Sequence, residues 1–289
     1  MTAATLRLTA RAKINLYLHV TGRRADGYHL MDSLVCFAEL GDELTIAPAS
    51  ALSLSLDGPF AASLAGADNL VLRAARLIDA NRGAAVHLNK QLPVAAGIGG
   101  GSADAAAALA GLARLWDLPL PSAARVLSLG ADLPVCLSGG PTFVGGIGED
   151  LQAAPPLPPT ALLLANPRRP LPTIDVFRGY AKTARAFSQP ARWSHVPQDA
   201  AALADLLAER GNDLTEAAIA LAPEIGDLLD AIARKPGCLL ARMSGSGASC
   251  FGLFAAAETA AKAAAGLQVA SPNWWIRATT IASGGAVAL

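Results

Sequence analysis

The sequence predicts an α+β protein with two domains, and three features of the chain support this prediction. Hydrophobic and polar residues alternate over much of residues 6–56, as β-strands require. A glycine-rich loop at 92–102 leads into an alanine-rich helix. Residues 153–159 hold four prolines and show no hydrophobic period. Because such a stretch favours neither helix nor strand, we expect a domain boundary there, between residues 1–155 and 156–289.

Composition narrows the class of protein. Lys and Arg together number 23, as do Asp and Glu, so the formal net charge is zero. Because this charge leaves no strongly basic surface, we expect no nucleic-acid partner. We also expect no membrane partner, because the longest apolar runs, such as 105–113, are too short to span a bilayer. The sequence carries no signal for a particular oligomeric state. The four cysteines are widely spaced and lack the spacing of a zinc site, which is typical of reduced thiols and predicts a cytoplasmic location.

The first domain is expected to begin with strands and to continue with helices and strands in turn. Residues 6–20 alternate loosely, which predicts two consecutive strand segments, and residues 31–40 and 42–47 predict two more. The other expected elements are strands at 52–56, 84–88 and 142–144 and helices at 69–80, 103–115 and 121–127. This mixture is typical of an α+β domain.

The second domain shows a similar mixture. Strands are expected at 161–165, 250–254 and 274–281, and helices at 200–209, 214–222, 223–234 and 258–267. A second loop rich in glycine and serine, residues 243–249, precedes one of these strands. Residues 180–198 carry few signals and are predicted to be loop with a short helix.

Glycines dominate the first loop, where Gly97, Gly99, Gly100 and Gly101 remove the Cβ atoms from one side of the backbone. Such a loop can turn sharply and present successive N–H groups to an anion. Ser102 stands where an N-cap belongs, so the positive end of the helix dipole would add to the attraction. The lysine of a Walker A loop is absent. Phosphate binding is the preferred interpretation, and a glycine-rich turn before a buried helix is the alternative.

Four other residues are candidates for a site, each with a structural alternative. Lys13 lies in an apolar strand, where it either extends to solvent at an edge or points into a site. Asp132 lies between Gly130 and Pro134 and is either a turn aspartate or a tightly placed functional carboxylate. Tyr28 and His29 either cover the rim of the core or contact a flat ring. The residues alone leave these alternatives open.

The order of these motifs resembles the GHMP kinase superfamily. Lys13 and Asn15 precede the segment from Gly22 to His29; Pro93-x-x-x-Gly97-Ile98-Gly99-Gly100-Gly101-Ser102 follows, and Met243-Ser244-Gly245-Ser246-Gly247 closes the set. This resemblance implies a two-domain fold with the active site in the cleft between an N-terminal ATP-binding domain and a C-terminal substrate-side domain. The first segment is similar to the branch that phosphorylates the 2-hydroxyl of 4-diphosphocytidyl-2-C-methyl-D-erythritol in the non-mevalonate isoprenoid route.

The resemblance also implies roles for individual residues. Asp132 would be the catalytic base and Lys13 would lie beside it as a buried pair, with ATP and Mg²⁺ as cofactors. ATP would be bound by Pro93, Gly97, Gly99, Gly100, Gly101, Ser102, Ser244 and Gly245, and Ser102 is also a candidate Mg²⁺ ligand. The cytidine diphosphate substrate would be bound by Asn15, Tyr28, His29, Thr173 and Phe177.

One departure and two alternatives accompany this interpretation. Many relatives have Ser-Ser-Asn where this chain has Ser102-Ala103-Asp104, so an acid stands in the first helical turn. We expect Asp104 to face away from ATP, as a helix-dipole or hydrogen-bonding residue. The alternatives are another small-alcohol kinase of the same superfamily, of the homoserine or mevalonate type, and an ATP-binding sensor that has lost catalysis.

Overall fold

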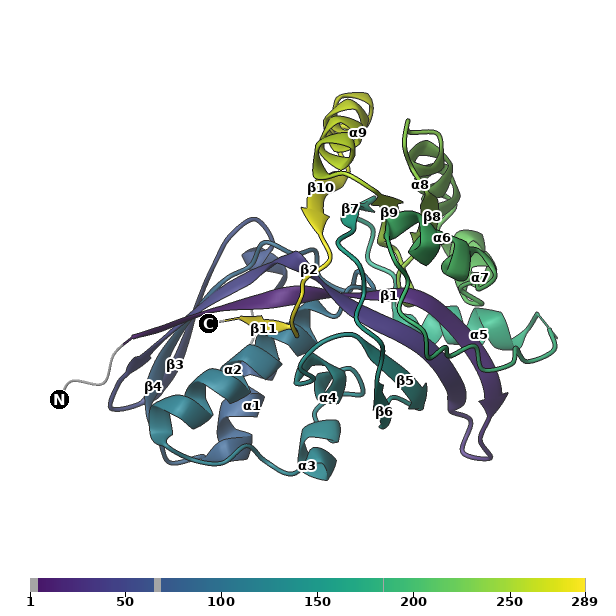
Figure 1. Ribbon diagram of the computed structural model, residues 1–289. Coiled ribbons are helices and arrows are strands. Elements are labelled where there is room, and N and C mark those ends of the chain that lie inside the picture. The colour runs from purple at the N-terminus through teal and green to yellow at the C-terminus, as the bar shows by residue number, and fades with distance from the viewer. Residues whose placement is uncertain (1–4, 65–68, 184, 289) are drawn as a thin grey trace.

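The computed structural model describes residues 5–64, 69–183 and 185–288, and it contains two β-sheets with helices packed on them. The seven-stranded sheet has the order β11-β1-β2-β4-β3, with β5 and β6 attached to β2. The four-stranded sheet has the order β10-β7-β9-β8. This architecture confirms the α+β prediction. Figure 1 shows β1 and β2 running across the molecule, with α1 and α2 on one side and the second sheet with α6 to α9 on the other.

The two longest strands, β1 (Leu6–Arg23) and β2 (His29–Pro48), pair with each other along most of their length. We expected two segments in each of these regions, and this prediction was wrong. The pairing of β1 with β2 shifts between Arg11 and Lys13, between Asn15 and Tyr17, and between Val20 and Gly22. These irregularities bend the strand and change its side-chain alternation without ending it, so the sequence pattern is broken where the strand continues.

The other elements of the first sheet follow the prediction closely. Strand β3 (Leu52–Asp57) runs parallel to β4 (Ala84–Asn89), and α1 (Leu70–Ile78) begins at Asn69, whose side chain accepts from the amide of Val71. Helix α2 (Gly100–Trp116) packs on the sheet. It approaches closely, because a Cβ atom added at Gly111 would lie 2.5 Å from Ile46 Cδ1. A short 3-10 helix, η1 (Ala61–Leu64), was not predicted.

The segment after α2 contains two short elements that the sequence did not indicate. Helix α3 (Ala123–Leu127) and strand β5 (Thr142–Gly146) lie where they were expected. Between them is the single helical turn α4 (Leu133–Cys136), which starts directly after Asp132. Strand β6 (Asp150–Ala153) pairs with β5. Elements of four residues are too short to produce a readable hydrophobic period.

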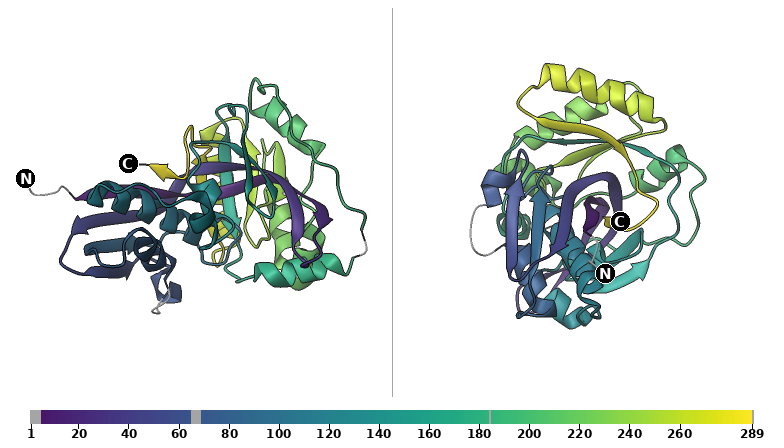
Figure 2. Two further views of the ribbon diagram at one scale, coloured as in Figure 1. Left: turned by 90° about the horizontal axis from the view of Figure 1, so that it is seen from below. Right: turned by 90° about the vertical axis from the view of Figure 1, so that its left-hand side faces the viewer.

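The second sheet consists of β7 (Ala161–Asn166), β8 (Leu240–Met243), β9 (Cys250–Phe254) and β10 (Trp275–Thr280). Its helices are α5 (Thr173–Ala181), α6 (Ala200–Ala208), α7 (Thr215–Leu221), α8 (Glu224–Ala233) and α9 (Ala257–Ala270). Helix α5 and strand β8 were not predicted. Figure 2 shows α8 and α9 on the outer side of this sheet.

One buried cluster joins the two sheets. Alternate residues of β7 point to opposite faces, so Leu163 packs with the helices, while Leu162 and Leu164 pack with Ile14 and Leu16 of β1. All strands of the second sheet lie after residue 155, but β11 (Val287–Ala288) returns to pair with β1. The boundary at 155/156 stays a prediction. Within the described ranges, no helix is long and apolar enough to cross a membrane.

Candidate active site

Lys13 and Asp132 are brought together from distant parts of the chain. Lys13 Nζ donates to Asp132 Oδ1 at 2.8 Å. The Lys13 side chain is 6% exposed and that of Asp132 is 48% exposed. We expected a buried pair, and this holds only for the lysine, since almost half of the Asp132 side chain is exposed. The ammonium thus holds one carboxylate oxygen in place, while the exposed part of the carboxylate is open to another molecule.

The glycine-rich loop contacts Lys13 through both its backbone and its side chain. The amide of Lys13 donates to the carbonyl of Ile98 at 2.9 Å. Gly99 has a φ of +61°, and a Cβ atom added there would lie 3.0 Å from the Cβ atom of Lys13 and 3.2 Å from its Cε atom. The lysine side chain therefore occupies the space that any larger residue at position 99 would need. Both the positive φ and this close contact favour glycine at position 99.

Gly99, not Ser102, is the N-cap of α2, so the predicted capping role of Ser102 was wrong. The left-handed conformation of Gly99 starts the helix three residues earlier than the pattern indicated, and Ser102 lies in the first turn. No described side chain caps this end. Because the first amide groups of a helix have no partner inside it, those of Gly100, Gly101 and Ser102 remain outside the helix's own bonding pattern. This arrangement suits an anion.

The two glycine-rich loops are in direct contact. A Cβ atom added at Gly97 would lie 2.5 Å from the carbonyl oxygen of Ser244 and 2.6 Å from that of Gly247. The buried Ser244 hydroxyl accepts from the amide of Asn15 at 3.1 Å and donates to the carbonyl of Gly97 at 3.0 Å. Both bonds of this hydroxyl are made within the protein, so Ser244 connects β1, the first loop and the second loop.

Asn15 provides a free acceptor beside the second loop. Its Nδ2 donates to Ser33 Oγ at 2.8 Å, whereas its Oδ1 is buried and has no partner. A Cβ atom added at Gly245 would lie 3.2 Å from this oxygen. Asn212, which the sequence did not single out, holds the same loop by donating to the carbonyls of Met243 and Gly245 at 2.9 and 2.8 Å. Only its position in the folded chain reveals this role.

Aromatic side chains gather where β2 begins and α5 passes. The rings of His29 and Phe177 are stacked, with centroids 5.2 Å apart and planes 23° apart, and Tyr180 meets His29 edge-on. Partial burial lowers the pKa of His29, and Arg23 adds to the effect. Tyr28 is 62% exposed. Two of the predicted rings are thus adjacent, and the third is exposed to solvent.

The remaining predicted residues border these groups. Pro93 is buried at the start of the first loop. Thr173, in the first turn of α5, shares a hydrogen bond with Ser246 of the second loop, with 2.8 Å between their hydroxyl oxygens. This bond connects the aromatic region with the glycine-rich loops.

A buried ionic cluster that the sequence did not indicate lies on the other side of the first loop. Lys90 Nζ donates to Asp42 Oδ2 at 2.5 Å and to Asp104 Oδ2 at 2.7 Å, and all three side chains are at most 3% exposed. Burial raises the pKa of Asp104, and the neighbouring Lys90 ammonium opposes this effect. Asp104 is therefore a hydrogen-bonding residue directed into the protein, and it partners a lysine rather than the helix dipole alone.

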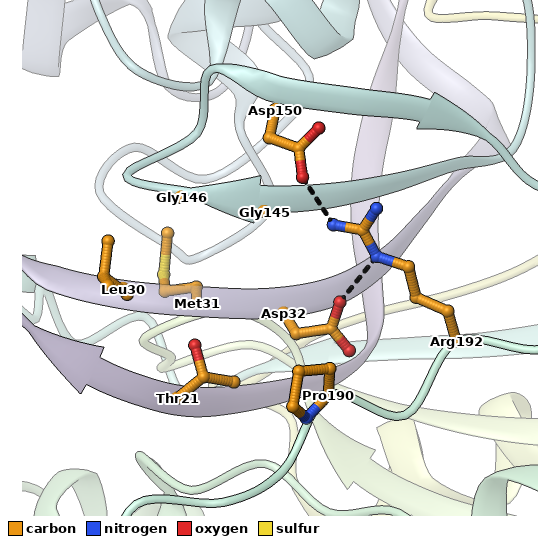
Figure 3. A pocket seen from close by; sticks show the side chains of 9 residues that line it. All are labelled: Thr21, Leu30, Met31, Asp32, Gly145, Gly146, Asp150, Pro190 and Arg192. Carbon is orange, nitrogen blue, oxygen red and sulfur yellow. Dashed lines mark hydrogen bonds and ion pairs between the residues drawn. The ribbon is translucent and has the colours of Figure 1, made fainter.

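A pocket of about 250 Å³ lies elsewhere along β2 and is lined by Thr21, Leu30, Met31, Asp32, Gly145, Gly146, Asp150, Pro190 and Arg192. Figure 3 shows Arg192 directed at two carboxylates, and its nitrogens lie 2.8 Å from Asp32 and 2.9 Å from Asp150. The arginine thereby fastens its own segment to β2 and β6. None of the predicted site residues lines this pocket.

Among the described residues, no group of three or more His, Cys, Asp or Glu side chains is arranged to hold a metal ion. Magnesium often binds proteins through only one or two side chains, with phosphate oxygens and water as the other ligands.

Comparison with known proteins identifies the family of the chain. Residues 69–143 match the family model described as the GHMP kinases N terminal domain, and residues 186–270 match GHMP kinases C terminal. A 4-diphosphocytidyl-2-C-methyl-D-erythritol kinase of Cereibacter sphaeroides is 56% identical over 92% of this chain and 96% of its own length. One from Paramagnetospirillum magneticum is 54% identical over 93% and 96%.

A solved structure extends the likeness to three dimensions. The crystal structure of a 4-(cytidine 5'-diphospho)-2C-methyl-D-erythritol kinase superposes with a TM-score of 0.75 at 31% identity, covering 96% of this chain and all of that one. Both the sequence and the fold are thus shared over nearly the whole length. The chain belongs to the GHMP kinase superfamily and, within it, to the 4-diphosphocytidyl-2-C-methyl-D-erythritol kinase family.

Proposed function

We propose that the chain transfers the γ-phosphoryl group of ATP to the 2-hydroxyl of 4-diphosphocytidyl-2-C-methyl-D-erythritol, in the non-mevalonate route to isoprenoid precursors. It is an ATP-dependent kinase with an alcohol as acceptor. The observation that carries the proposal is the 2.8 Å pair of Lys13 and Asp132 beside the glycine-rich loop. Phosphoryl transfer needs a positioned acceptor, charge neutralisation and a base, and this arrangement can supply all three.

Asp132 is the proposed base. Its carboxylate is half exposed, so a substrate hydroxyl can approach within hydrogen-bonding distance, and its second oxygen is available to accept the proton. The Lys13 ammonium holds the carboxylate by its hydrogen bond and adds positive charge where the attacking oxygen becomes an alkoxide. Lys13 is itself fixed by its backbone bond to Ile98, so the pair is positioned before substrate binds.

The first loop and the start of α2 are the proposed site for the ATP phosphates. The amide groups of Gly100, Gly101 and Ser102, together with the helix dipole, would bind anionic oxygens. Mg²⁺ would supply charge neutralisation on the phosphates, and the Ser102 hydroxyl is the proposed side-chain ligand. The contact between Gly97 and Ser244 keeps the loop in place against the second half of the chain.

The cytidine group would bind at the aromatic cluster. Tyr28 and Phe177 are the proposed stacking rings, with His29 hydrogen-bonding the edge of the base; stacking contributes about 1–3 kcal/mol per base. Asn15 Oδ1, buried and without a partner, is the proposed acceptor for a substrate hydroxyl. Thr173 lies between this region and the second loop. We place the reaction in the cytoplasm because all four cysteines are unpaired.

A direct assay tests the function. The purified protein is incubated with Mg-ATP and, in separate reactions, with 4-diphosphocytidyl-2-C-methyl-D-erythritol, homoserine or mevalonate, and ADP release is followed. We expect ADP only with the first alcohol. ADP with one of the others would keep the kinase and reject the cytidine assignment. Measurable ATP binding without ADP from any of them would favour a sensor.

A further inference from the structure

We propose that Asp42, Lys90 and Asp104 form an ionic clamp that joins the two ends of residues 93–99 through the buried Lys90 ammonium and so positions this loop for the phosphates of ATP. The three residues are positioning residues, because none of them reaches the proposed substrates. The inference rests on the proposed function only in assuming that this loop binds a nucleotide. It does not depend on which alcohol accepts the phosphoryl group.

Asp42 holds the chain where the loop begins. Its Oδ1 accepts from the amides of Gln91 and Leu92, at 2.6 and 2.8 Å. Its Oδ2 accepts from the ammonium of Lys90 at 2.5 Å. One carboxylate on β2 therefore fixes both the backbone and the side chain of the segment that leads into Pro93.

Asp104 holds the chain where the loop ends. It lies in the second turn of α2, and its Oδ2 accepts from the same ammonium at 2.7 Å. The ammonium is also close to the helix start, because a Cβ atom added at Gly100 would lie 3.1 Å from Lys90 Nζ. Lys90 thus connects the segment before the loop with the helix after it, directly behind the amides proposed to bind phosphate.

The loop needs such an external restraint. Ala95, Gly97 and Gly99 all have positive φ values, of 51°, 74° and 61°, and Ala95 has to hold this conformation with a side chain. A segment with three left-handed residues in five gains little from local backbone preference. Its shape must therefore be imposed by contacts at its ends and along its length.

The cluster is poorly explained by stability alone. It buries two carboxylates with one ammonium, and Asp104 Oδ1 has no hydrogen-bond partner. Removing charges from water is costly, and well-packed apolar residues often replace buried ion pairs without loss of stability. What apolar residues cannot supply is a directional bond from one atom to both ends of a loop. The geometry therefore points to position, rather than burial, as the contribution of these charges.

The test is Asp104→Ala in the full chain, with Asp104→Leu as a second variant that keeps the side-chain volume. Both remove the acceptor from Lys90. Asp104→Asn restores an acceptor of the same shape, and Leu112→Ala is the matched control, since it removes a fully buried side chain from the same helix. Each protein is examined for its thermal midpoint, its Kd for Mg-ATP by calorimetry, and amide hydrogen exchange over residues 91–102.

We expect Asp104→Ala and Asp104→Leu to weaken Mg-ATP binding about tenfold, which corresponds to about 1.4 kcal/mol, and to speed amide exchange in the loop. Asp104→Asn should stay within about threefold of the unchanged protein. Leu112→Ala should lower the thermal midpoint yet leave the Kd within about twofold.

Two outcomes would overturn the clamp. One is a Kd for folded Asp104→Ala or Asp104→Leu within twofold of the unchanged protein. The other is an equal loss of binding in Leu112→Ala, which would make the effect one of stability. Calorimetry uses Mg-ATP alone, so a protein that binds ATP and phosphorylates a different alcohol would fail the functional proposal while still testing the clamp. If the unchanged protein bound no ATP, both proposals would fall.

Discussion

Two lysine–aspartate clusters lie on either side of the same loop, and they differ in how open they are. Lys13 packs against Gly99 and donates to Asp132, whose side chain is 48% exposed. Lys90 lies behind Gly100 and donates to Asp42 and Asp104, both at most 3% exposed. Consecutive glycines thus separate a half-open ion pair from a closed one.

The difference shows that lysine and aspartate can either take part in the reaction or hold the loop in position. In the open pair the carboxylate keeps a lone pair and a route to solvent, so a substrate proton can reach it. In the closed cluster both carboxylates are enclosed by protein, and Asp42 is saturated by the lysine and two backbone amides. Removing a charge should therefore change turnover in the first cluster and nucleotide binding in the second.

The largest effect is expected from Asp132→Asn. The amide cannot accept the substrate proton, so kcat should fall by about 10²–10⁴-fold, the usual contribution of general-base catalysis. The Kd for Mg-ATP should stay within about threefold, because the phosphate loop is untouched. Steady-state kinetics and calorimetry measure the two quantities, with Asp230→Asn on the exposed face of α8 as the control. Near-normal turnover in Asp132→Asn would show that another residue is the base. The contrast between the Lys13–Asp132 pair and the buried cluster would then be wrong.

The paired variants Gly99→Ala and Gly100→Ala are expected to have the next largest effect. The added methyl group would contact Lys13 in the first variant and Lys90 in the second. Gly99→Ala places a methyl group in the left-handed region, at a cost of about 1–2 kcal/mol, and it displaces the Lys13 side chain. We expect lower stability and a fall in kcat of about tenfold. Gly100 is already helical, so Gly100→Ala gains about 0.5–1 kcal/mol of helix preference and shifts Lys90 slightly. Denaturant unfolding measures the stability of both variants, and steady-state kinetics measures their kcat. Equal losses of kcat would contradict the assignment of Lys13 to turnover and of Lys90 to nucleotide binding.

Tyr28→Ala is expected to leave both clusters intact and to affect only the binding of the cytidyl substrate. Losing one stacking ring should raise KM for the cytidyl substrate by roughly tenfold, in line with the 1–3 kcal/mol of a base–aromatic contact. KM for ATP and kcat should change little, because Tyr28 is exposed and distant from the loop in sequence. Val196→Ala, another exposed apolar residue, is the control. An equal rise in both KM values would show that the ring does not discriminate between substrates.

Much of the fold follows from local pattern. The helix at Leu70–Ile78 and the strand at Ala84–Asn89 match the predicted positions because each carries a readable hydrophobic period. The strand at Cys250–Phe254 matches as a short apolar run. The single strands at Leu6–Arg23 and His29–Pro48 were divided in the prediction because bulges interrupt their alternation. Burial of β1 on both faces near Ile14 removes the remaining contrast.

The sequence by itself determined the motifs: the glycines of the loop, the lysine in β1 and the aspartate before Pro134, all of which are local arrangements of residue types. Only the tertiary structure decided how they meet. Lys13 reaches Asp132 across 119 positions, Ser244 reaches Gly97 across 147, and Lys90 reaches Asp42 across 48. Local preference cannot specify such pairs, because they form when the long bent strands and the packing of two sheets bring distant segments together.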